Sequence, residues 1–113
     1  LAGVISPTAL ANAAANDDFA PTGIGPANVL RLSTSGGACV VGGLASGSGF
    51  ITDRMILVVN TGANNISLVH ESGGSTAQFR FSLAGSANVV IRPNGSVKIW
   101  YDLASTRWRA LAI

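Results

Sequence analysis

The sequence predicts an all-β protein, an antiparallel β-sandwich or jelly roll of about eight short strands with an extended or partly helical N-terminal arm. The chain has 113 residues, which is the size of one domain. From residue 28 onward, short segments rich in β-branched and aromatic residues are separated by glycine, serine and asparagine, and no helical pattern interrupts them. Short strands at such close spacing are typical of sandwiches and barrels.

Residues 1–27 differ in composition from the rest of the chain, so we expect an arm at 1–27 and a β-sandwich domain at 28–113. The alanine-rich stretch 11–16 favours helix, but so short a helix is marginal in water by itself. Proline and glycine at 21–26 then interrupt any regular element. Two interpretations stay open, an arm that becomes ordered by docking on a partner and a frayed terminus.

The domain is expected to contain eight strands, and its last hairpin has a well-defined register. The expected strands are residues 28–34, 38–44, 53–60, 65–71, 79–83, 87–92, 96–103 and 107–113. A four-residue loop at 103–106 places Tyr101 opposite Trp108 on one face of the last hairpin. The same register places Trp100 opposite Arg109 on the other face. A shift by one residue would mix apolar with charged side chains, so this register is favoured.

Two further turns predict hairpins earlier in the domain. A three-residue turn at 93–95, with Gly95 in the left-handed conformation, pairs Ile91 with Val97. A four-residue loop at 61–64 pairs Leu57 with Leu68 on the face that we expect to point inward.

The outward face of the second of these hairpins is also apolar, because it carries Ile56, Val58 and Val69 with Ser67 as its small polar member. A half-exposed strand should alternate between apolar and polar residues. We therefore expect Ile56, Val58 and Val69 to contact another subunit or the arm, and the chain to form a homo-oligomer. The composition agrees, because 48% of the residues are hydrophobic and only 11% are charged.

Composition also excludes several classes of function. The formal net charge is +2, and the seven Lys and Arg residues are scattered rather than gathered on one stripe, so no nucleic-acid partner is expected. The longest aliphatic run, residues 55–59, is far shorter than the roughly 20 residues of a membrane-spanning helix, so no membrane insertion is expected. Cys39 is the single cysteine, so no intrachain disulfide is possible and no Cys/His zinc site or other cofactor is expected.

A catalytic constellation is also not apparent. The single histidine, His70, follows apolar residues on an expected inward face and is interpreted as a buried, hydrogen-bonded residue rather than a catalytic base. The glycine pairs do not match a phosphate-binding loop or a nucleophile elbow, and we interpret them as tight turns. The chain is therefore not expected to be an enzyme.

One group of outward-facing side chains on the last hairpin is a candidate contact surface for a glycan or a partner. It consists of Trp100, Arg109, Asp102, Arg107 and Lys98. A tryptophan beside an arginine suits a cation–π pair, sugar stacking or an aromatic anchor at a protein interface. The alternative is a cross-strand pair that only stabilises the hairpin.

Several segments, taken together in their order and spacing, resemble a β-sandwich module of tailed-bacteriophage virion proteins, which occurs in fibres, spikes and small virion proteins. The segments are residues 18–23 with 29–32, 59–62 with 68–72, 75–77 with 80–81, and 100–102 with 107–109. The resemblance implies a non-enzymatic component of the particle surface that is a homotrimer or another symmetric oligomer. A short chain with an arm suits a capsid decoration (cement) protein that docks on the major capsid protein through that arm. The alternative is a receptor- or glycan-binding module of a tail fibre or spike.

Overall fold

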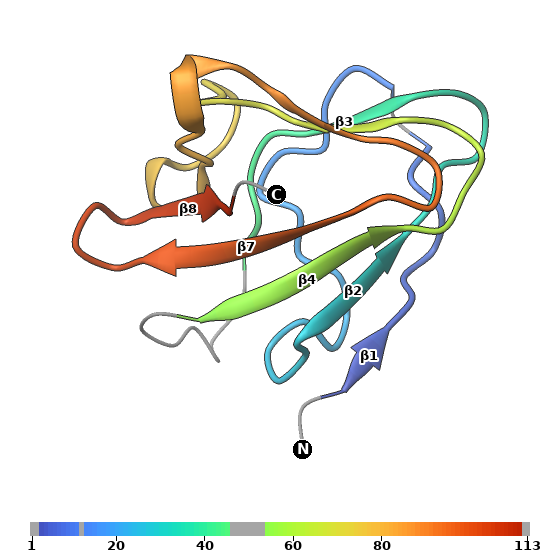
Figure 1. Cartoon of the computed structure of the whole chain (residues 1–113), viewed down its shortest axis with the longest axis horizontal. Helices are drawn as coiled ribbons and strands as arrows, with labels where there is room; N and C mark the ends of the chain where they lie inside the picture. The colour runs from blue at the N-terminus through green and yellow to red at the C-terminus, as the bar shows by residue number, and fades with distance from the viewer. Residues whose placement is uncertain (1–2, 12, 46–53, 112–113) are drawn as a thin grey trace.

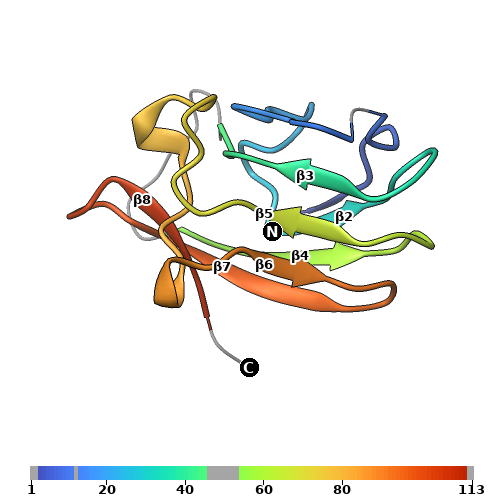
Figure 2. The same cartoon turned by 90° about the horizontal axis from the view of Figure 1, so that it is seen from above.

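The computed structural model describes residues 3–11, 13–45 and 54–111 and contains two mixed β-sheets (Figures 1 and 2). The larger sheet has the strand order β1-β2-β4-β7-β8 and the smaller sheet has the order β3-β5-β6. The strands are β1 Val4–Ile5, β2 Val29–Leu32, β3 Cys39–Val41, β4 Met55–Asn60, β5 Ile66–Leu68, β6 Val89–Ile91, β7 Ser96–Asp102 and β8 Arg107–Ala110. Two short 3-10 helices, η2 Ala77–Phe79 and η3 Ala84–Ser86, lie between β5 and β6. The prediction of an all-β protein is confirmed.

Buried residues from both sheets form one hydrophobic core. Trp108, Ile56, Ile66 and Ile99 are fully buried in it. The pairing differs from the expected antiparallel pattern, because β1 with β2, β2 with β4, and β3 with β5 are parallel pairs. Each of these parallel partners is reached by a connection that leaves the sheet and returns to it.

Strands form within seven of the eight expected ranges, and residues 79–83 are the exception. This segment makes isolated bridges, from Arg80 to Gly43 and from Phe81 to both His70 and Trp108. The segment therefore pairs through single bridges with several different neighbours. Because no one strand runs alongside it, it does not continue as a ladder.

The register predicted for the last hairpin is confirmed, since Tyr101 faces Trp108 and Trp100 faces Arg109. The other two hairpins were predicted wrongly. β4 lies between β2 and β7, whereas β5 lies between β3 and β6, so both turns carry the chain from one sheet to the other. The left-handed residue of the second turn is Asn94, with a φ of 63°, and not Gly95. Asparagine tolerates this conformation better than most residues with a side chain.

Asn60 explains why the chain crosses between sheets at these two turns. Its side chain is fully buried, and its Nδ2 donates to the carbonyl oxygens of Asn64 (2.7 Å) and Ile91 (2.8 Å). Its Oδ1 accepts from the Gly62 amide at 3.0 Å. Its backbone also accepts a hydrogen bond from the Asn94 amide. One side chain therefore satisfies backbone groups of both crossing turns, which a simple hairpin would have paired within itself.

The apolar residues of β4 face the opposite way from the expected one. Ile56 and Val58 have exposed fractions of 0% and 2% and lie in the core of this chain, in the same cluster as Leu10 and Ile24 of the N-terminal segment. Of the two expected contacts, another subunit or the arm, their burial within the chain leaves no surface for another subunit. Once β4 pairs with β2 and β7, its alternation points these two side chains at the smaller sheet. Leu57 and Val59 point outward and are half-buried. Val69, which follows β5, is also half-buried.

The described residues before β2, 3–11 and 13–27, pack against the rest of this chain rather than standing apart as an arm. β1 extends the larger sheet, and Leu10, Ile24 and Ala27 are buried. Nη2 of Arg54 donates to the carbonyl oxygens of Ile24 and Ala27 and so fastens this segment to the chain just before β4. The described part of 1–27 therefore supplies one strand and part of the hydrophobic core.

Candidate functional site

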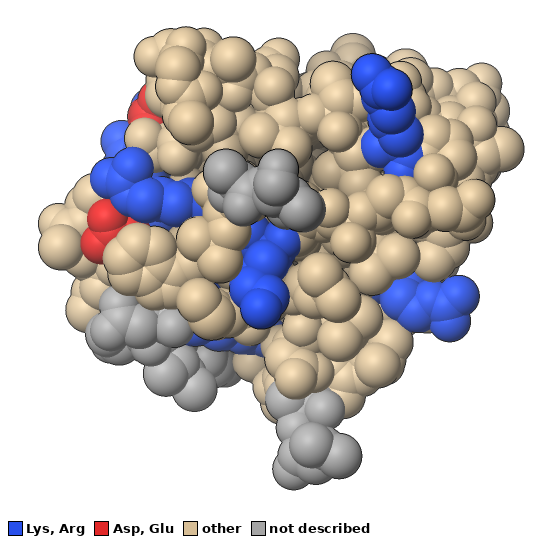
Figure 3. Space-filling view, viewed as in Figure 1, with Lys and Arg blue, Asp and Glu red and all other residues tan. Residues whose placement is uncertain are grey.

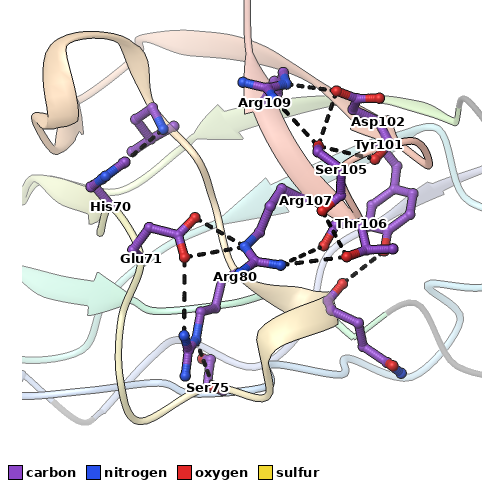
Figure 4. Close-up of polar contacts among 12 residues, drawn as sticks. His70, Glu71, Ser75, Arg80, Tyr101, Asp102, Ser105, Thr106, Arg107 and Arg109 are labelled. Carbon is purple, nitrogen blue, oxygen red and sulfur yellow. Dashed lines mark hydrogen bonds and ion pairs between the residues drawn. The ribbon is translucent and has the colours of Figure 1, made fainter.

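The end of the β7–β8 hairpin meets the loop that follows β5 in a group of charged and polar side chains (Figure 4). Glu71 is central to this group. Its Oε2 accepts from Nε of Arg107 at 2.9 Å, and its Oε1 lies 4.0 Å from Nη1 of Arg80. Nε of Arg80 donates to the carbonyl oxygen of Ser75 at 2.9 Å. These contacts hold the loop 70–80 against β8.

A second ion pair lies on the outward face of the same hairpin. Nε of Arg109 donates to Oδ2 of Asp102 at 2.8 Å, and Oγ of Ser105 donates to the same oxygen at 3.0 Å. The hydrogen bond from Arg109, followed by that from Ser105, lowers the pKa of Asp102 below its usual value. The carboxylate is therefore ionised at neutral pH, and Arg109 and Ser105 of the same hairpin are its hydrogen-bond partners.

Two aromatic residues fix the inward face of the hairpin. The rings of Tyr101 and Trp108 meet edge to face, with centroids 5.1 Å apart and planes at 74°. Oη of Tyr101 donates to the Gln78 carbonyl oxygen at 2.9 Å, and Nε1 of Trp108 donates to the Leu44 carbonyl oxygen at 2.8 Å. Burial raises the pKa of Tyr101 above its ordinary value, an effect that Arg107 partly opposes. Each buried polar end thus has a partner, as the fold requires.

The predicted contact surface is brought together only in part. Trp100 is half-buried on the outward face of β7, between Met55 of β4 and Arg109 of β8 in the ladder. Asp102 joins it through the ion pair with Arg109. Arg107 instead turns to Glu71. Lys98 lies further along β7, opposite Leu57. Trp100 and Arg109 therefore lie side by side on this surface, with Asp102 held in the ion pair to Arg109.

His70 is half-buried, and its Nδ1 accepts a hydrogen bond from the Leu83 amide at 2.9 Å. That nitrogen is therefore occupied in the folded chain. Cys39 is buried, with its sulfur 3.5 Å from the Leu10 carbonyl oxygen. Within the described ranges, no group of three or more His, Cys, Asp or Glu residues lies together as metal ligands would.

Sequence reasoning did not identify the polar contacts between residues 17–18 and the loop 72–76. Asp17 accepts from the hydroxyls of Ser72 and Ser75. Asp18 accepts from the amide and the hydroxyl of Thr76, at 2.8 and 2.7 Å. The available signal was weak, because two adjacent carboxylates and a serine-rich loop some 55 to 58 residues away carry no shared pattern.

The face of the larger sheet that points away from the smaller sheet is mostly apolar, and we call it the outer face. Its apolar members are Val4, Val29, Met55, Leu57, Val59, Trp100 and Leu111, and its polar members include Arg31, Ser96, Lys98 and Arg109. Val4 and Met55 have exposed fractions of 59% and 50%. Figure 3 shows this face, with separated Lys and Arg side chains on a largely uncharged surface and acidic groups only at its left edge.

The side chains of Arg31 and Lys98 on the outer face have no hydrogen-bond or ion-pair partner within the part of the chain that the structure describes. By contrast, the four described carboxylates (Asp17, Asp18, Glu71 and Asp102) all accept hydrogen bonds within the chain. The outer face is therefore apolar with a surplus of positive charge.

Comparison with models of protein families, with curated proteins and with solved structures finds no match to this chain. None of the helices in the described ranges is long and apolar enough to span a membrane.

Proposed function

We propose that this chain is a non-enzymatic structural component of a tailed-phage particle, a capsid decoration protein with a sandwich or jelly-roll-like module that oligomerises on the particle surface. The observation that carries the proposal is the outer face, where Val4, Met55 and Leu111 are exposed and the apolar side chains between them are half-buried in the described chain. Exposed apolar side chains gathered on one face mark contacts between proteins. Other virion proteins, the major capsid protein among them, are the proposed partners.

The use of the polar side chains supports a structural role. The segments that resemble the virion module meet in space, where Glu71, Arg80 and Arg107 hold one another and Asp18 binds Thr76. These groups are occupied in holding loops to the hairpin. Side chains so engaged stabilise a shape and are not free to bind and activate a substrate.

The packing of residues 3–27 changes how docking is proposed. A segment that supplies β1 and the buried Leu10 would have to leave its own fold in order to bind elsewhere. We therefore place the contact with the particle, and with other copies of the chain, on the outer face. A trimer with a symmetry axis normal to the particle surface would suit this arrangement.

The first experiment is the copy number of this chain in purified particles, measured by quantitative mass spectrometry against the major capsid protein. We expect a ratio equal to that of the capsid protein or a simple fraction of it. A handful of copies would instead indicate a fibre or tail tip, and absence from the particles would contradict the proposal.

A receptor- or glycan-binding module is the second candidate, and the placement of Trp100 favours it. Its ring lies on the outer face beside the ion pair of Arg109 and Asp102, and aromatic faces flanked by hydrogen-bonding groups suit sugar rings. A Trp100→Ala variant separates the two candidates. Loss of cell binding with normal assembly would support the glycan-binding function, whereas loss of assembly with the fold intact would support the structural function.

A further inference from the structure

A groove opens between the two sheets where β6 of the smaller sheet diverges from β7 and β8 of the larger one. It has a volume of about 440 Å³ and is lined mainly by apolar side chains. Its lining includes Val89, Ile91, Val97, Ala110, Leu111 and Arg92. Val89 and Ile91 belong to β6, so one wall of the groove is the edge strand of the smaller sheet.

The backbone of β6 has a free edge, and the ladder shows which groups lie on it. The Cys39 amide donates to Asn65, and the Val69 amide donates to Val41, so the odd-numbered residues of this segment direct their backbone groups at β3. The backbone groups of Ile66 and Leu68 therefore face β6, where they pair with Ile91 and Val89.

It follows that the N–H and C=O of Val90 point away from β5. No described residue pairs with them on that side, because β6 is the last strand of its sheet. The Val90 side chain is 50% exposed. A free edge of this kind is a template for another strand.

The opposite edge of the same sheet is covered by this chain. Nδ2 of Asn16 donates to the Val40 carbonyl oxygen at 2.8 Å, and the Gly42 amide donates to the Asn16 carbonyl oxygen. The N-terminal segment thus blocks the β3 edge, as proteins commonly do with their sheet edges. The β6 edge has no such cover within the described ranges.

Charge indicates what the occupant carries. Arg92 lines the groove directly after β6, is exposed, and has no ion-pair partner in the described part of the chain. None of the described carboxylates lines the groove. A second copy of this chain is a poor occupant, because its described carboxylates are already held by internal hydrogen bonds.

We propose that this groove binds an extended segment of a partner protein, which adds to β6 as a further strand. The segment pairs with the backbone of Val90, places apolar side chains at alternate positions into the groove, and sets a carboxylate against Arg92. This site shares Leu111 with the outer face but is built on the β6 edge of the smaller sheet, and it does not rest on the function proposed above.

The test uses the whole chain and a fluorescently labelled, acetylated peptide of sequence Thr-Val-Thr-Val-Thr-Val-Glu, with a second peptide that ends in Lys. We expect the Glu peptide to bind more tightly than the Lys peptide in fluorescence anisotropy. In NMR spectra, the Val90 amide is expected to shift and to exchange more slowly with solvent in the complex. Binding without any change at Val90, or no binding at millimolar peptide, would overturn the proposal.

Two variants and a control sharpen the test. Val90→Pro removes the free N–H without breaking a ladder bond and is expected to weaken binding by about tenfold. Val90→Thr keeps the donor and the side-chain shape, so it should bind as the parent chain does. Arg92→Glu should reverse the preference between the Glu and Lys peptides, and Arg31→Glu on the outer face should not. Protection of the Val90 amide by self-association without peptide would show that a second copy is the occupant and would contradict the proposal.

Discussion

Tyr101 is the single tyrosine of the chain, and its exposed fraction is 2%. Burial raises the pKa of its phenol above the ordinary value of 10.0. Because the pKa in the folded chain exceeds that in the unfolded chain, the contribution of Tyr101 to stability is complete below about pH 10 and is lost as the pH rises through the folded pKa. We expect the tyrosinate absorbance at 295 nm to appear together with unfolding, at a pH above the one at which an exposed tyrosine titrates.

Tyr101→Phe is the control for this expectation. It removes the hydrogen bond to the Gln78 carbonyl oxygen and should lower the free energy of unfolding at pH 7 by about 1 kcal/mol. It should also flatten the loss of stability at alkaline pH. A phenol that titrates at its ordinary pKa in the folded chain would contradict the burial argument.

Asn60 is the most consequential buried polar side chain, because both of its amide hydrogens meet carbonyl oxygens. Asn60→Asp keeps the shape but sets a carboxylate against the Asn64 and Ile91 carbonyl oxygens. We expect the free energy of unfolding to fall by about 3 kcal/mol or more at pH 7, measured by urea denaturation. Because this site raises the pKa of the new carboxyl, the loss should lessen at acidic pH.

The matched control is Asn94→Asp, at an exposed turn residue where Asp tolerates the positive φ. Its free energy of unfolding should stay within about 0.5 kcal/mol of the parent. Equal losses in the two variants would show that added charge, rather than the carbonyl contacts of Asn60, causes the effect.

The N-terminal segment is held to the sheets as an element of the fold, through the β1–β2 pair and the buried Leu10. The Leu10 amide donates to Ser33, and the Ser35 amide donates to Leu10, so the segment is also tied by backbone hydrogen bonds. Leu10→Ala should lower the free energy of unfolding by about 2–5 kcal/mol, because it leaves a cavity in the core. Thermal or urea unfolding measures this directly.

Leu103→Ala provides the comparison, because Leu103 has an exposed fraction of 48% in the β7–β8 turn. Its effect should stay within about 0.5 kcal/mol. A negligible effect of Leu10→Ala would show that the segment does not stabilise the domain, which is what either a docking arm or a frayed terminus would give.

The hairpins show where reasoning along the chain succeeds and where it fails. The β7–β8 register could be predicted because short-range sorting of Tyr101, Trp108, Trp100 and Arg109 allows one alignment only. The turns at 61–64 and 93–95 allow a local hairpin equally well. The chain nevertheless changes sheets there, since β4 pairs with β2 and β7, and Asn60 satisfies backbone groups at the crossing.

For the whole molecule, the outer face is the surface on which self-association is expected. Leu57 lies on this face in the central strand β4, half-buried between Val29 and Lys98. Leu57→Glu places a charge in the proposed contact and should shift the chain toward the monomer in sedimentation equilibrium. Ser67→Glu, on the outward face of the smaller sheet, should leave the association unchanged. Equal association of both variants and the parent would place the contact elsewhere.

The sequence by itself determined that the chain is all-β, where seven of its strands lie, and how its last hairpin pairs, because these depend on residues close together in the chain. It also indicated that both faces of one predicted hairpin are apolar, whereas a sheet with one side exposed to solvent needs only one apolar face. Only the tertiary structure decided which face of β4 is core, that β1 completes the larger sheet, and that the described residues leave the β6 edge open. These depend on which strands lie side by side, and when both faces of a strand are apolar its own pattern does not distinguish core from surface.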